Sequence, residues 1–138
     1  YSTWFYDVDF TPDGKRLVFS DAFGTVRYWN IDRQRLETAI RCDERVRSFA
    51  FLPQGNLLAA SGNPGRLSIW DVAAAKRLAQ YEELEEHTFC IAASADGSVL
   101  ASGGSDSQVR LWATTSNPDD HRTTAALIRA WDSGAGDP

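Results

Sequence analysis

The sequence has few of the residues that build catalytic and metal centres. Its 138 residues include two cysteines, two histidines and no methionine. The histidines, His87 and His121, lie 34 residues apart, and no Cys/His spacing fits a zinc site. No serine stands in a Gly-x-Ser-x-Gly turn, and the glycine-rich run at residues 102–105 lacks the lysine of a phosphate-binding loop. The sequence therefore predicts a protein that is not an enzyme and that uses no cofactor and no metal.

Long apolar runs and clustered basic charge are also missing. No apolar run approaches the ~20 residues that a helix needs to cross a bilayer, which argues against membrane insertion. The 14 basic residues are scattered in a chain of net charge −5, so direct nucleic-acid binding is not expected. No pattern pairs Cys42 with Cys90, which favours reduced thiols and an intracellular location, cytoplasmic or nuclear. The lack of methionine and an opening at Tyr1 in mid-pattern predict a segment of a longer protein.

What the sequence does contain is one pattern that occurs three times. Its markers are a turn glycine, a strand leucine and a closing tryptophan: Gly14, Leu17 and Trp29, then Gly55, Leu58 and Trp70, then Gly97, Leu100 and Trp112. Successive markers are 41 and 42 residues apart, and 15 residues separate glycine from tryptophan in every copy. A period in the low forties indicates a repeat architecture.

Each copy of the pattern predicts four short strands separated by turns. Apolar, β-favouring runs alternate with turn residues, of which Asp96-Gly97 is the strongest hairpin signal. The expected strands cover residues 3–10, 16–20, 25–31 and 35–41, then 46–52, 57–61, 66–72 and 77–84, then 88–94, 99–101, 109–112 and 124–131. Residues 73–76 favour a helix by propensity, but the repeat predicts a strand directly after them. Residues 115–121 are expected to form a polar surface loop, and the tail from Asp132 is expected to fray.

The pattern also predicts how the sheets pack. In each copy the tryptophan follows another apolar residue, as in Tyr28-Trp29 and Leu111-Trp112. Adjacent residues of a strand point to opposite faces, so each sheet has two apolar faces and needs a like sheet on either side. This predicts an all-β fold of three consecutive four-stranded antiparallel blades of a β-propeller, at residues 1–43, 44–86 and 87–133, with a tail at 134–138. Three blades make an incomplete ring, since closed propellers have about four to eight. Further blades are expected from the same chain or from other copies.

These repeats resemble the WD-repeat (WD40) family of β-propellers. The signature dipeptide stands as Trp70-Asp71, while Asn30 and Ala113 follow the other two tryptophans. The aspartate that the family places six residues before the tryptophan is present only as Asp106. We therefore expect the family's hydrogen-bonded side-chain tetrad to be largely absent, and the blades to rely on apolar packing.

The resemblance further implies a binding surface. In WD-repeat proteins, partners commonly dock on the face around the central channel, at the start of each innermost strand and in the turn before the tryptophan strand. The partner-binding residues implied by position are Trp4, Tyr6, Ala22, Arg45, Arg47, Asn63, His87, Phe89 and Ser105. Aromatic residues and arginine are common anchors of protein interfaces. The implied function is a non-catalytic scaffold that binds other proteins or peptides within a multiprotein complex.

Two alternative interpretations use the same features. In the first, the propeller is a sensor or recruitment module of an enzyme whose catalytic domain lies outside this chain. In the second, the five tryptophans bind sugar, although three of them hold the repeating structural position, where core packing is the expected role.

Overall fold

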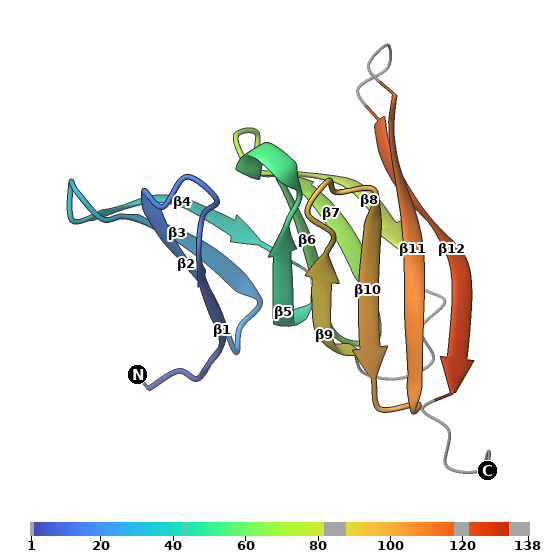
Figure 1. The fold of residues 1–138 in the computed structure, drawn as a ribbon. Helices are drawn as coiled ribbons and strands as arrows, with labels where there is room; N and C mark the ends of the chain where they lie inside the picture. Colours follow the sequence, from blue (N-terminus) through green and yellow to red (C-terminus); the bar gives the residue numbers. More distant parts are fainter. Residues whose placement is uncertain (1, 43, 82–87, 118–121, 133–138) are drawn as a thin grey trace.

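Three four-stranded sheets account for nearly all of residues 2–42, 44–81, 88–117 and 122–132, which the computed structural model describes (Figure 1). Blade 1 contains β1 (Phe5–Phe10), β2 (Arg16–Asp21), β3 (Thr25–Asn30) and β4 (Arg35–Arg41). Blade 2 contains β5 (Arg45–Phe51), β6 (Leu57–Asn63), β7 (Leu67–Asp71) and β8 (Lys76–Tyr81), with the 3-10 turn η1 (Pro53–Gly55) before β6. Blade 3 contains β9 (Thr88–Ala93), β10 (Val99–Gly104), β11 (Gln108–Asn117) and β12 (Arg122–Asp132).

This architecture confirms the predicted fold class. In each blade, strands that are consecutive in sequence pair antiparallel, and the described sheets stack without closing a ring. The predicted strand at residues 77–84 is confirmed for residues 77–81, within β8, which begins one residue earlier at Lys76; residues 82–84 lie outside the described residues. The one described helix is η1, which is far too short to cross a membrane.

The last hairpin differs from the prediction. The expected loop at residues 115–121 is wrong for residues 115–117, which continue β11 and pair with the start of β12. Thr115 lies opposite Thr124, and β-branched side chains favour an extended backbone. Asp132 likewise ends β12 and does not begin a tail. Residues 118–121 and 133–138 lie outside the described residues.

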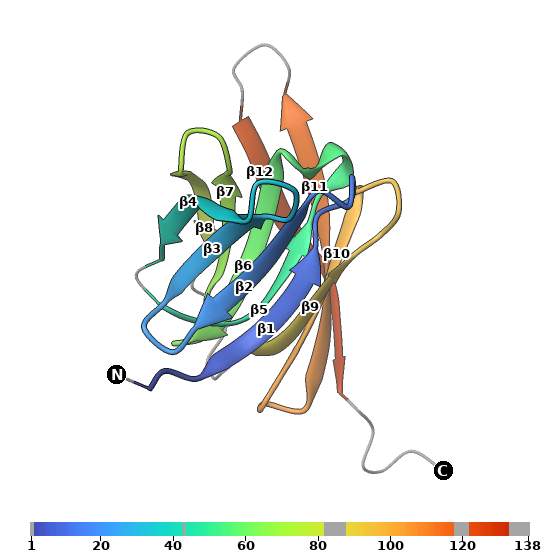
Figure 2. The same ribbon diagram turned by 90° about the vertical axis from the view of Figure 1, so that its left-hand side faces the viewer.

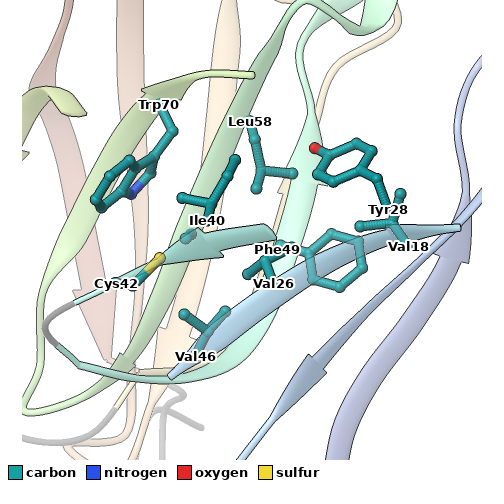
Figure 3. Packing of buried hydrophobic residues seen from close by; sticks show 10 residues of the cluster. Val18, Val26, Tyr28, Ile40, Cys42, Val46, Phe49, Leu58 and Trp70 are labelled. Atoms are coloured by element: carbon teal, nitrogen blue, oxygen red, sulfur yellow. The ribbon is translucent and has the colours of Figure 1, made fainter. Parts of the chain in front are cut away.

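Blades 1 and 2 each bury their rear face against the front face of the blade that follows. On the rear of blade 1, Val18, Val26, Tyr28 and Ile40 form one cluster with Phe49, Leu58, Ala60 and Trp70 on the front of blade 2 (Figure 3). One repeat later, Ala59, Leu67 and Ile69 on the rear of blade 2 form a second cluster with Ile91, Leu100 and Trp112 of blade 3. The two clusters use equivalent strand positions, so the same packing is repeated from blade to blade.

The front face of blade 1, seen in Figure 2, has no blade packed on it within the described residues. Val8 is 59% exposed, whereas Phe49, at the equivalent position of blade 2, is 4% exposed. Trp29 is 37% exposed, whereas Trp70 is 6% exposed. Phe5, Val8, Leu17 and Phe19 line an open apolar groove of about 340 Å³ on this face. Blade 1 therefore presents the kind of surface that blades 2 and 3 bury.

Polar contacts fix the register between neighbouring blades. The Asp7 carboxylate accepts a hydrogen bond from the Phe49 amide at 3.0 Å. One repeat later, the Ser48 hydroxyl accepts one from the Ile91 amide at 3.2 Å. Asp7 and Ser48 each stand seven residues before the turn glycine of their own blade. One N–H group of each of the innermost strands β5 and β9 is thus satisfied by a side chain of the preceding blade.

Packing between turns repeats in the same way. A Cβ built on Gly55 would lie 3.2 Å from Pro12 Cδ, and one built on Gly97 would overlap the ring of Pro53. No atom lies within 4 Å of a Cβ built on Gly14, the equivalent glycine of blade 1. The turn of one blade therefore sits on the turn glycine of the next.

The tryptophans of two blades form side-chain hydrogen bonds that the sequence analysis did not predict. Trp70 Nε1 donates to Ser68 Oγ at 2.9 Å, and Ser68 Oγ donates to the Glu44 carboxylate at 2.9 Å. Trp112 Nε1 donates to Ser102 Oγ at 2.9 Å. In blade 2, Ser68 lies on the same strand as Trp70, two residues before the tryptophan. The spacing of the family pattern therefore does not identify Ser68 as the partner of Trp70.

Substituting the turn glycines tests the contact between turns. Gly97 and Gly14 both have a φ of +70°, so Gly14→Ala is expected to cost about 1 kcal/mol through backbone strain alone. Gly97→Ala adds a clash with Pro53 and is expected to cost ~1–3 kcal/mol more. Urea unfolding measures the difference, and Pro53→Ala in the Gly97→Ala background is expected to recover part of it. Equal stabilities of the two glycine variants would contradict this packing.

Candidate functional site

A pocket of about 530 Å³ lies where the loops of blades 1 and 2 meet. Its lining residues, which we call the loop pocket, are Ala22, Phe23, Arg41, Cys42, Glu44, Arg45 and Asn63. They come from the β2–β3 turn, the β4–β5 connection and the end of β6. Three of them, Ala22, Arg45 and Asn63, are among the residues predicted to bind a partner, and the fold brings these three together.

Asp21 fixes the turn that forms one wall of the loop pocket. Its carboxylate accepts hydrogen bonds from the amides of Phe23 at 2.9 Å and Thr25 at 3.1 Å, and it pairs with the Arg27 guanidinium. Burial raises the pKa of Asp21, but the hydrogen bonds from Arg27, Thr25 and Phe23 outweigh burial, so the pKa lies below its ordinary value of 3.8. The family pattern does not identify Asp21, because it places the aspartate six residues before the tryptophan and Asp21 lies eight residues before Trp29.

Glycine allows this turn to sit directly on the β4–β5 connection. Gly24 has a φ of +80°, and a Cβ on it would collide with the backbone carbonyls of Cys42 and Glu44. The Gly24 carbonyl accepts the Cys42 amide hydrogen at 2.8 Å. The two walls of the pocket are therefore joined through backbone atoms, which holds the pocket in shape before anything binds.

Charge in the loop pocket is divided between its interior and its rim. Glu44 is only 7% exposed, and its carboxylate is directed inward to Ser68. Arg41 and Arg45 are exposed, and neither forms an ion pair within the described residues. By contrast, Arg110 pairs with Asp106. The rim thus offers two guanidinium groups to an incoming group.

Exposed Phe23 lines the loop pocket together with these arginines, and exposed Trp4 is joined to the same turn through its backbone. Phe23 is 70% exposed at the tip of the β2–β3 turn, and Trp4 is 74% exposed. The Trp4 carbonyl accepts the Ala22 amide hydrogen at 2.8 Å, which ties the two segments together. Phe23 and Arg41 were not predicted to bind a partner. The available signal was an aromatic residue at a turn position where small polar residues are usual.

The other predicted residues are placed elsewhere. Tyr6 and Arg47 form a pair between β1 and β5, with the guanidinium carbon 5.0 Å from the ring centroid, a cation–π geometry. Ser105 is exposed in the β10–β11 turn of blade 3. The backbone of Phe89 lies in β9, but its side chain, like the whole of His87, is outside the described residues. In the described ranges no group of three or more His, Cys, Asp or Glu side chains is placed to hold a metal ion.

Comparison with known proteins identifies the fold family. The WD domain, G-beta repeat family (WD40) matches residues 35–71 and 79–113, more than half of the chain. Protein ROOT INITIATION DEFECTIVE 3 of Arabidopsis thaliana is 28% identical over 105 residues, which are 76% of this chain and 24% of that protein. The guanine nucleotide-binding protein subunit beta of Oryza sativa subsp. indica is 30% identical over 118 residues, which are 77% of this chain and 31% of that protein.

A solved structure agrees with this result. The crystal structure of RRP9 WD40 repeats matches with a TM-score of 0.78 and 15% sequence identity, covering 94% of this chain and 39% of that chain. The family match, together with the twelve described strands of this chain, shows that the chain belongs to the WD40 family of β-propeller repeats. The chain spans less than a third of the length of the curated relatives described above.

Replacing Asp21 by asparagine tests how the pocket wall is held. We expect Asp21→Asn to lower the free energy of unfolding by about 1–3 kcal/mol at pH 7, because a buried charge-assisted network is lost. The folded-state pKa lies below the unfolded one, so the advantage of the wild type is full at neutral pH and shrinks as the pH falls below ~4. Urea unfolding between pH 2.5 and 7 measures this trend. Asp32→Asn, at an exposed turn residue, is the control, and a pH-independent gap for Asp21→Asn would contradict the assignment.

Proposed function

We propose that this chain is a non-catalytic part of a WD40 propeller and that it binds other proteins through the loop pocket. The observation that carries the proposal is the convergence of Arg41 and Arg45, without ion pairs in the described residues, with the exposed ring of Phe23 in one pocket. Arginine and aromatic side chains dominate the binding energy of protein interfaces. Exposed apolar surface with polar residues around it is typical of interaction sites.

The relatives support membership of a multiprotein complex. Several of them are named as the beta subunit of a guanine nucleotide-binding protein, so those proteins work beside other subunits. The proposal includes an intracellular location, cytoplasmic or nuclear. It is supported by Cys42 and Cys90, neither of which is in a disulfide, because an exposed cysteine such as Cys90 suits a reducing compartment when it is not oxidised.

Charge reversal at the rim tests the proposal. Arg45→Glu is expected to remove protein partners captured from a cell extract by the immobilised chain, because it places a carboxylate at the mouth of the pocket. Arg35→Glu is the matched control: Arg35 is also exposed and without an ion pair in the described residues, but it begins β4 at the opposite end of blade 1. Arg47 is left unchanged because it stacks on Tyr6 between the blades. Capture that Arg45→Glu does not alter, in a variant with a wild-type circular dichroism spectrum, would contradict the proposal.

We further propose that another blade, from the same polypeptide or from another copy, covers the front face of blade 1. The support is the equivalence of positions: Val8 and Trp29 are exposed where Phe49 and Trp70 are buried. In addition, no atom of the described residues lies within 4 Å of a Cβ built on Gly14, whereas Pro12 lies against the equivalent glycine of blade 2, Gly55.

Either source of the extra blade predicts that the isolated chain associates in solution. Light scattering is expected to give a mass above that of one chain. The double variant Phe5→Glu, Val8→Glu is expected to shift the mass towards the monomer, because it places charge in the apolar groove. Ala73→Glu with Ala74→Glu, in the exposed β7–β8 turn, is the control. A wild-type chain that remains monomeric and soluble would refute this part of the proposal.

A further inference from the structure

We propose that the loop pocket takes the carboxylate of an extended acidic peptide segment from a partner protein, with an apolar neighbour of that residue packed on Phe23. This inference rests on the proposed interaction function and deepens it, because it names the chemistry that the partner presents. Three independent properties of the pocket support the inference: its charge, its apolar surface and its rigidity.

The charge of the pocket selects a monoanion. Among the described lining residues, Arg41 and Arg45 contribute two positive charges and Glu44 one negative charge, so these three leave one net positive charge at neutral pH. The Glu44 carboxylate cannot turn outward without losing its hydrogen bond to Ser68, which also holds Trp70. One carboxylate balances this charge, whereas a phosphate of about two negative charges exceeds it in a chain whose net charge is already −5.

The guanidinium groups of Arg41 and Arg45 can bind an anion without first breaking an ion pair in the described residues. Arg16 and Arg27 are already paired with Glu37 and Asp21, so an incoming anion would have to displace those partners. Arg41 and Arg45 have no such partner in the described residues. A guanidinium binds a carboxylate through parallel N–H donors, which gives orientation as well as attraction.

The remaining surface suits an extended peptide. A volume of about 530 Å³ lies within the usual range of ligand pockets and accommodates more than a single carboxylate. Phe23 supplies apolar surface in the same pocket as the arginines, and Asn63 adds an amide to its lining. Ala22 bonds to the backbone of Trp4, and Asp21 holds the amide of Phe23, so the turn is ordered before binding.

Fluorescence anisotropy with short labelled peptides tests the inference. The probe is acetyl-Gly-Phe-Glu-Leu-Gly-amide carrying fluorescein, compared with the same peptide containing glutamine or phosphoserine in place of glutamate. The glutamate peptide is expected to bind at least about tenfold more tightly than the glutamine peptide, the effect of one charge-assisted hydrogen bond. Arg41→Gln, Arg45→Gln and Phe23→Ala are each expected to weaken it by about tenfold or more, whereas Arg35→Gln is expected to leave it unchanged.

Three results would overturn the inference. They are glutamate and glutamine peptides of equal affinity, a phosphoserine peptide that binds more tightly than the glutamate peptide, or no saturable binding of the glutamate peptide. If Arg45→Glu still abolishes partner capture in any of these cases, the interaction function stands and only the acidic chemistry is rejected. If capture is also unaffected, the interaction function itself fails.

Discussion

The structure depends on the burial of one blade against the next at a fixed register. A single four-stranded sheet of short strands has too small a core to be stable alone, so the described blades gain stability from the neighbours they pack against. Trp70 and Trp112 show this directly, because they are 6% and 2% exposed at the two junctions. Trp29 has the same position in blade 1 and is 37% exposed. One rule of packing therefore explains both the cohesion of the described blades and the apolar face that blade 1 presents.

The polar contacts between blades turn this burial into a defined arrangement. Apolar clusters tolerate some sliding, whereas the hydrogen bond from Phe49 to Asp7 allows only one relative height of blades 1 and 2. It also satisfies an N–H on the edge of β5, which would otherwise be open to pairing with another strand. The loop pocket follows from this arrangement, since Ala22 and Phe23 come from blade 1 and Arg45 and Asn63 from blade 2. The loop pocket is therefore a consequence of stacking and not of any single blade.

The strands could be predicted from the sequence because the repeat carries more information than local propensity. Residues 73–76 favour a helix by composition, yet Ala75 takes a φ of +50° in a tight turn, as Gln34 does 41 residues earlier. Equivalent positions have equivalent conformations because the blades pack in the same way. The length of the last hairpin was not predictable on this basis, since its extension beyond Trp112 has no counterpart in the other two blades.

Side-chain partners were less predictable, because they depend on where neighbouring segments lie in space. Ser68 can hold Trp70 only because Glu44, 24 residues earlier, reaches the same point. Three predicted binding residues do meet in the loop pocket, since they were assigned by strand position, which the repeat specifies. Phe23 and Arg41 were missed because nothing local in the sequence shows that the β2–β3 turn rests on the β4–β5 connection.

The electrostatics of the loop pocket limit how it recognises a partner. The net charge of −5 repels acidic proteins at long range, but at physiological salt this field is screened beyond about 8 Å. Attraction by Arg41 and Arg45 is therefore felt only when a carboxylate is already close, so the pocket contributes to selection and to residence time more than to the rate of encounter. A single carboxylate and one apolar side chain give modest affinity after the entropy of a flexible peptide is lost. Tight binding then requires further contacts on the same face, and neighbouring blades held in register can supply them simultaneously.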